Sequence, residues 1–172
     1  KYFVLQIDAH TDFRDEVRGE RLGLSSTMRR SMELDCVTGM LQVGQRGIGS
    51  TRPADYHDAL EMGVKYVPAR QVHAQGIQTA IDLIPAGAKV IIDLDCDALD
   101  PSVNPGAIGR APGGLTYWHI VELIHGVAAK ATIAGFALVE FMPDVDVDSL
   151  GALNNARIIC NVLGEVTRQA HR

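Results

Sequence analysis

The chain has 172 residues, of which 47% are hydrophobic and 22% charged, and its formal net charge is −5. This composition excludes a wholly disordered chain, and the length suits one domain with a substantial core. The dispersed Lys and Arg residues argue against a nucleic-acid-binding surface, and the short apolar runs exclude a membrane span. Because no signal-peptide pattern opens the sequence and the three cysteines have no paired spacing, we expect a cytoplasmic protein with reduced thiols.

Short β-branched or apolar runs alternate with longer helical patterns along the whole sequence. We predict strands over residues 2–7, 40–43, 64–67, 89–94 and 132–139. We predict helices over residues 26–34, 52–62, 72–83, 116–130 and 149–168. Alternation of this kind with short loops is typical of a parallel sheet covered by helices on both faces. In such sheets the functional residues gather at the carboxyl ends of the strands.

The predicted helices differ in how clearly the sequence marks their ends and faces. We expect Thr116 to cap the fourth helix, and Ser50 or Thr51 to cap the second. In the final helix, spacings of three and four residues bring six side chains near one face, namely Leu150, Leu153, Ala156, Arg157, Cys160 and Leu163.

No internal repeat, low-complexity segment or linker divides the sequence, so we expect a single domain over residues 1–172. The sequence enters an apolar strand directly at its first residues, without a methionine or a lead-in. We therefore expect this domain to be truncated at its N-terminus.

Carboxylates follow three of the predicted strands. The sequence D-A-H-T-D at residues 8–12 follows the first strand, D-L-D-C-D at residues 93–97 ends the fourth, and Glu140 follows the last. Residues two apart share a face of an extended chain, so each segment gathers acidic side chains on one face. A single acid at a strand end is more often a helix cap, but two such clusters, one with a histidine, indicate a metal site. Mixed carboxylate and imidazole ligands favour manganese over magnesium or zinc, and a pair of ions would suit hydrolysis.

These segments resemble the signature motifs of the ureohydrolases, the family of arginases, agmatinases and other guanidino-compound hydrolases. Residues 8–12 match the D-A-H-T-D motif, and residues 95–101, D-C-D-A-L-D-P, are similar to the second metal motif. Residues 135–143, G-F-A-L-V-E-F-M-P, resemble the third motif, and the three cover nearly the whole chain. The resemblance implies an α/β, three-layer arginase-like fold with a parallel sheet flanked by helices. It also implies a pair of Mn²⁺ ions at the strand ends and a homo-oligomer, either a trimer or a hexamer.

The resemblance assigns a role to each acidic position. The expected metal ligands are Asp8, His10, Asp12, Asp95 and Asp97. Glu140 corresponds to the acid that receives the guanidinium of the substrate, and Asp12 would also orient the nucleophile, so these two are the expected catalytic residues. The implied reaction is attack by a metal-bridging hydroxide on an agmatine-like guanidino compound, which gives urea and an amine.

The sequence departs from the family pattern in several places, and two of them concern the metal ligands and proton transfer. The first metal ligand of the family is a histidine in a G-G-D-H motif upstream of residues 8–12, and this sequence begins after that point. One of the two expected manganese positions therefore lacks its imidazole. Leu24 stands where relatives carry a loop histidine that shuttles protons or places the substrate. Loss of a general acid or base lowers a rate by about 10²–10⁴-fold.

Three functions follow from these features. The first is an agmatinase-type amidinohydrolase, which the loop over residues 18–30 favours through its length and its M-R-R ending. The second is a divergent, weakly active or inactive member that acts as a binding or assembly subunit, for which Leu24 and the absent histidine are the evidence. The third is a hydrolase for a carboxylated guanidino or formimino substrate, whose acidic tail Arg14 or Arg110 would bind. Cys96 lies between two expected ligands, but its side chain should point away from them.

Overall fold

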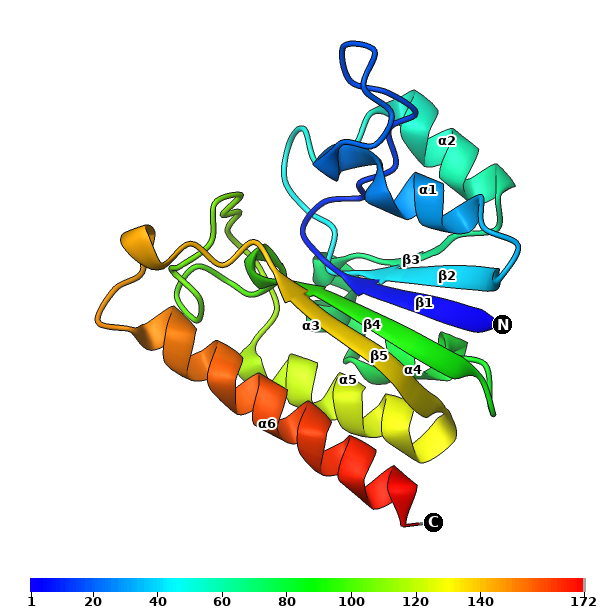
Figure 1. Ribbon diagram of the computed structural model, residues 1–172. Coiled ribbons are helices and arrows are strands. Elements are labelled where there is room, and N and C mark those ends of the chain that lie inside the picture. Colours follow the sequence, from blue (N-terminus) through cyan, green and yellow to red (C-terminus); the bar gives the residue numbers. More distant parts are fainter. Residues whose placement is uncertain (172) are drawn as a thin grey trace.

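The computed structural model describes residues 1–171 as a five-stranded parallel sheet between two layers of helices (Figure 1). The strands are β1 (Tyr2–Ile7), β2 (Val37–Val43), β3 (Lys65–Val67), β4 (Lys89–Asp95) and β5 (Thr132–Val139), in the order β3-β2-β1-β4-β5. The helices are α1 (Thr27–Met32), α2 (Pro53–Glu61), α3 (Ala69–Gln75), α4 (Gln78–Leu83), α5 (Tyr117–Lys130) and α6 (Leu150–Ala170). The predicted parallel α/β sheet with helices on both faces is confirmed.

Helices α1 and α2 cover one face of β1–β3, and α3 to α6 cover the other face of the sheet (Figure 1). Alternation along β1 explains this arrangement, because Phe3, Leu5 and Ile7 belong to the large core under α3–α5 while Val4 packs on the α1 side. The central strands are thus buried on both faces, as parallel strands usually are. They form a rigid base for the loops at their carboxyl ends.

The structure corrects two of the predicted helices. Residues 72–83 form two helices rather than one, because Gly76 ends α3 with a φ of 84°, a left-handed conformation that suits glycine. The residue that precedes α2 is Arg52, with Pro53 at the first helical position, so neither Ser50 nor Thr51 caps this helix. The predicted cap of α5 is confirmed, since the Thr116 hydroxyl accepts a hydrogen bond from the backbone N–H of His119.

Helix α6 packs through a different face from the one that the spacing singled out. Its buried residues are Gly151, Asn155, Ile158, Val162 and Glu165. On the predicted face, Leu153 and Leu163 are 53% and 59% exposed, and Cys160 is also exposed. The helix carries two apolar stripes, and the buried one includes Asn155, whose side chain bonds Asn104 beneath it at 2.9 Å. Spacing alone cannot choose between two stripes of this kind.

The carboxyl ends of β1, β4 and β5 are neighbours in the sheet, so the loops that follow these strands meet (Figure 1). Among residues 1–171, no helix is both long and apolar enough to span a membrane.

Candidate functional site

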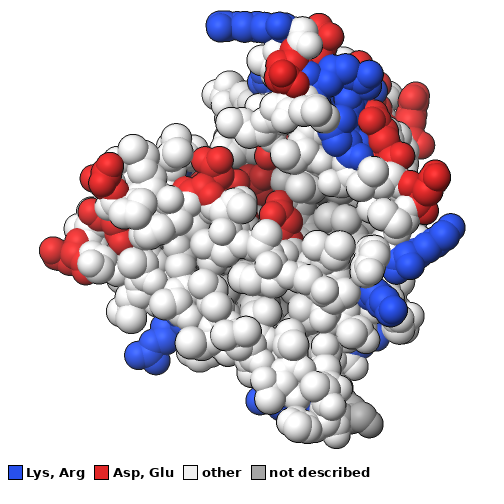
Figure 2. Space-filling model, viewed as in Figure 1, with Lys and Arg blue, Asp and Glu red and all other residues white. Residues whose placement is uncertain are grey.

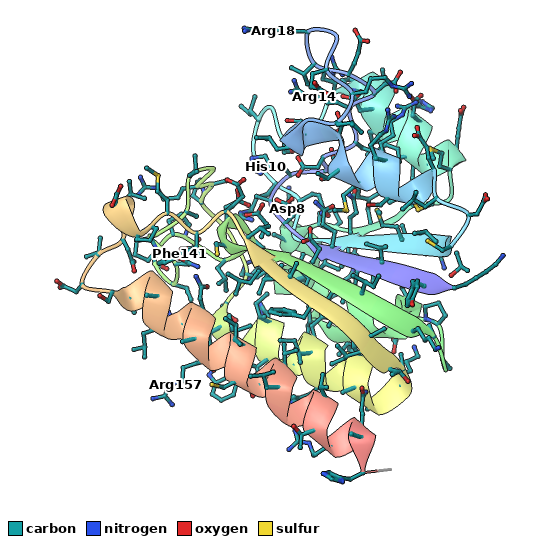
Figure 3. All side chains as sticks on the ribbon, in the orientation of Figure 1. Asp8, His10, Arg14, Arg18, Phe141 and Arg157 are labelled. Atoms are coloured by element: carbon teal, nitrogen blue, oxygen red, sulfur yellow. The ribbon has the colours of Figure 1, made fainter. Side chains whose placement is uncertain are left out.

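Three side chains from two strand ends form a tight cluster. Ligand atoms of Asp8, His10 and Asp97 all lie within 4.8 Å of one another. The Nδ1 atom of His10 is 3.2 Å from Oδ2 of Asp97 and 3.4 Å from Oδ1 of Asp8. Both carboxylates are buried, whereas the imidazole is partly exposed. Figure 3 labels Asp8 and His10 where the chain leaves β1 and enters the hollow beside the sheet.

The backbone and a buried amide hold the Asp8 carboxylate in place. Its Oδ1 accepts a hydrogen bond of 2.7 Å from the backbone N–H of His10, and its Oδ2 accepts one of 2.6 Å from the Gln6 side chain. Gln42, the partner of Gln6 across β1 and β2, donates to Gln6 Oε1 and, at 2.7 Å, to the carbonyl of Thr11. The amide pair therefore links the Asp8 carboxylate to the chain that follows His10.

The β4 carboxylates are held by the turn that follows the strand. The backbone N–H of Asp97 donates to Asp95 Oδ1 at 3.1 Å, which caps the short 3-10 turn Cys96–Ala98. The backbone N–H of Ala9 donates to Asp97 Oδ1 at 3.2 Å, so the two strand ends are joined directly. The Cys96 side chain points away from the cluster, as predicted, and its Sγ accepts a hydrogen bond from Asn155 at 3.3 Å.

A cleft of about 240 Å³ lies over this cluster. Five of the six predicted site residues line it, namely His10, Asp12, Asp95, Asp97 and Glu140, while Asp8 is buried beside them. Figure 2 shows acidic side chains in the hollow between the part of the molecule that carries α1 and α2 and the loops opposite. Asp12 and Glu140 both have left-handed backbones, with φ values of 44° and 60°. Left-handed backbones are uncommon for residues other than glycine, and Arg18, Asp148 and Ser149, outside the cleft, have them too.

Burial and mutual repulsion shift the acid–base properties of the cluster. Desolvation raises the pKa of Asp95 to about 9, and that of Asp8 to about 7. The pKa of Asp12 rises to about 6 for the same reason. Hydrogen bonds to Asp8 and Asp97 raise the pKa of His10 to about 10. Without a cation, the cleft therefore disfavours the ionised form of Asp8, Asp12 and Asp95, and a bound cation would offset this.

Of the three residues other than the acids and His10 that the sequence analysis placed near the substrate, two line the cleft. Leu24 and Arg14 both line it, and the Leu24 side chain is 73% exposed. Arg110 is exposed and is not among the lining residues. Among the described residues, His10 is the one histidine that lines the cleft. Among the described residues, therefore, no other histidine in the cleft replaces the loop histidine that relatives carry at the position of Leu24.

Two residues that sequence reasoning missed also shape the cleft. Asp55, in the first turn of α2, is buried and bonded to the Arg52 guanidinium at 2.6 and 2.9 Å. Gly109 approaches the cluster so closely that a Cβ there would lie 2.5 Å from Asp97 Oδ2 and 2.8 Å from His10 Cε1. The R-x-x-D spacing at residues 52–55 could have indicated the ion pair of Asp55. Nothing in the sequence around Gly109 indicated its contact with the cluster.

The donor set fits a divalent cation. Several oxygen ligands and one imidazole converge from two strands, and three of their atoms already lie within 4.8 Å of one another. Buried carboxylates with raised pKa values are groups that a cation would stabilise in their ionised form.

Comparisons with known proteins agree with this geometry. The model of the Arginase family matches residues 1–164. An N(1)-aminopropylagmatine ureohydrolase of Thermus thermophilus is 31% identical over 144 residues, which are 84% of this chain and 47% of that protein. A guanidinobutyrase of Pseudomonas aeruginosa is 29% identical over 95% of this chain and 52% of its own length. The structure of proclavaminate amidino hydrolase from Streptomyces clavuligerus superimposes with a TM-score of 0.85 and 27% identity, over 97% of this chain and 56% of that one.

This chain belongs to the arginase family, and its arginase-like fold is confirmed. It spans about half the length of the curated relatives it matches.

Without bound metal, this chain should lose stability as the pH rises from about 5 to 9. Asp8 and Asp95 have folded-state pKa values of about 7 and 9 against an ordinary 3.8, so the folded state binds more protons than the unfolded state across this range. His10, raised from 6.5 to about 10, acts in the same direction. Thermal unfolding of chelator-treated protein should show a midpoint that falls steadily with pH.

The variant Asp95→Asn is the control for this dependence, because it removes one of the titrating groups and keeps the side-chain shape. Its unfolding midpoint should fall less steeply over the same range. A midpoint in the original chain that is constant or rises between pH 5 and 9 would contradict the raised pKa values.

Proposed function

We propose that this arginase-family chain carries the metal centre of an amidinohydrolase, which cleaves a guanidino compound to urea and an amine. The observation that supports this best is the cleft that His10 and Asp12 after β1, the buried Asp95 and Asp97 of the β4 end, and Glu140 after β5 line together. A guanidinium is a planar cation that carboxylates bind through paired hydrogen bonds, so this cleft suits its charge and its shape. The names of the relatives, which specify guanidino substrates, support the same class.

The metal ligands in this proposal are Asp8, His10, Asp12, Asp95 and Asp97. Manganese suits this mixture of carboxylates and one imidazole, and the family resemblance implies a pair of ions. Bound divalent metal lowers the pKa of water, so that a nucleophile is available near neutral pH. The protein would hold the substrate against this centre as part of a homo-oligomer, a trimer or a hexamer.

Each remaining side chain has a task that its position allows. Glu140 lines the same cleft and would accept hydrogen bonds from the guanidinium. Asp12 also lines the cleft and, besides binding the metal, would orient the attacking water through a hydrogen bond. Leu24 is apolar and exposed at the mouth, so it would contact the substrate chain and would transfer no proton.

A second candidate substrate class has one observation in its favour. Arg14 lines the cleft on the side where α1 lies, and Figure 3 shows it beyond His10 along the same loop. A cation at the mouth would attract a carboxylate tail and repel an amine. A carboxylated guanidino compound such as 4-guanidinobutyrate is therefore the alternative to agmatine.

The function is tested by urea release from agmatine and from 4-guanidinobutyrate in the presence of Mn²⁺. We expect urea from at least one of them, and the ratio of the two kcat/KM values decides which tail the mouth prefers. Glu140→Gln should lower kcat/KM by about 10–100-fold, because a charge-assisted contact is lost. Glu122→Gln, an exposed change on α5 outside the cleft, is the matched control and should change nothing.

Absence of urea from both substrates, with Mn²⁺ bound, would overturn the hydrolase proposal for this chain. That result would favour the binding or assembly subunit that Leu24 suggests.

A Cβ at position 109 should damage the metal centre selectively. In Gly109→Ala the added methyl would meet the Asp97 carboxylate and the His10 ring, so one of them must move. We expect Mn²⁺ affinity, measured by calorimetry, to fall by about 10-fold or more, as when other supporting groups of metal ligands are lost.

The control for this variant is Gly164→Ala, because a Cβ there meets nothing within 4 Å and the position lies inside α6. This change should leave Mn²⁺ affinity as it is and stabilise the helix slightly. Equal affinity in Gly109→Ala and the original chain would show that the cluster does not bind the metal.

A further inference from the structure

The guanidinium of Arg46 lies behind the cluster and is surrounded by backbone carbonyls. Arg46 follows the carboxyl end of β2, and its side chain is partly buried. It donates hydrogen bonds to six carbonyl oxygens from three segments of the chain, those of Gly44, Asp97, Ala98, Leu99, Ala111 and Pro112. The shortest are 2.6 Å to Asp97 and 2.7 Å to Ala111.

Three of these carbonyls belong to successive residues at the end of the turn that carries Asp97. The oxygens of Asp97, Ala98 and Leu99 lie 2.6, 3.2 and 3.2 Å from the Arg46 terminal nitrogens. A guanidinium has five N–H donors in a fixed plane, so one side chain bonds several converging carbonyls at once. Arg46 therefore fixes the backbone on both sides of Ala98.

The backbone of Arg46 is joined to the other half of the cluster. Its N–H donates at 3.0 Å to the carbonyl of Ala9, the residue between Asp8 and His10. Ala9 in turn donates to the Asp97 carboxylate. One residue thus connects the segment that carries Asp8 and His10 with the segment that carries Asp97.

The surroundings of Arg46 are fitted to this contact. A Cβ at position 114 would lie 2.4 Å from the backbone nitrogen of Asp100 and 2.6 Å from Nη2 of Arg46, so the glycine there leaves room for both. Burial lowers the pKa of Arg46, while Asp97, Asp100 and Asp8 act against that shift. Since arginine stays protonated in proteins, the group is a fixed cation beside an acidic cluster.

We propose that Arg46 is a positioning residue that fixes the Asp97 carboxylate relative to Asp8 and His10, and thereby sets the affinity of the cluster for a divalent metal. The affinity part rests on the metal centre proposed above, whereas the positioning part is a property of the chain without metal. Arg46 does not line the cleft, so its effect passes through the backbone of residues 97–99.

Two variants separate the geometry of Arg46 from its charge. Arg46→Met removes both, and Arg46→Lys keeps the charge but has three donors on one nitrogen, too few for six carbonyls. Val127→Ala, a change at a buried core residue of α5 that does not line the cleft, is the control for general loss of stability. All are measured on the whole chain, at a temperature at which each is folded.

The first readout is hydrogen–deuterium exchange of the chelator-treated chain. Both Arg46 variants should exchange faster at residues 96–100 and 111–115, and Val127→Ala should not do so selectively. Unchanged exchange in these two segments would overturn the positioning role, whatever the metal does.

The second readout is Mn²⁺ affinity by calorimetry. We expect both Arg46 variants to raise the dissociation constant by about 10–100-fold, and Val127→Ala to leave it nearly unchanged. Arg46→Lys with the affinity of the original chain would show that charge alone matters and would overturn the proposal. Absence of Mn²⁺ binding to the original chain would refute the metal centre, and with it the affinity part, while the exchange experiment would still decide the positioning part.

Discussion

Negative charge buried at the carboxyl ends of β1 and β4 is the constraint on which the rest of this structure depends. The sheet order makes these strands neighbours, so Asp8 and Asp97 meet across them, and a single imidazole lies between. Carboxylates in such a setting need hydrogen bonds, a cation or protons. Gln6 and backbone N–H groups supply the hydrogen bonds, and His10 supplies part of the positive charge. A bound metal would supply the rest.

The loops over the cluster are folded so that further acids reach the same space. Asp12 and Glu140 adopt left-handed backbones, which cost about 1–3 kcal/mol each and persist only where neighbouring contacts impose them. The carbonyl of Asp12 accepts the N–H of Met28 at 3.1 Å, and the segment after Glu140 is bonded to Gly106 through Met142 at 2.8 Å. These backbone conformations direct two carboxylates into one cleft, at some cost in the free energy of folding.

The sequence was most informative where a residue's position follows from strand geometry. A period of two places Asp93 and Asp95 on one face of β4, and the parallel sheet brings the ends of β1 and β4 together. Asp97 lies in a 3-10 turn and Asp12 has a left-handed backbone, so alternation does not account for their positions. The role of these residues as ligands stays a prediction. The contacts of Gly109 and Arg46 could not be predicted, because they depend on how separate loops pack rather than on any local pattern. The buried face of α6 was missed because two apolar stripes compete and a buried Asn155 marks the packed one.

The most direct test of the account is diffraction from crystals of this chain grown with Mn²⁺, collected at the manganese absorption edge. Anomalous scattering locates manganese without any assumption about activity or ligands. We expect a peak within coordination distance of Asp8, His10 and Asp97. Saturating Mn²⁺ that leaves no peak at this cluster, or a peak only elsewhere, would contradict the claim that these carboxylates form a metal centre.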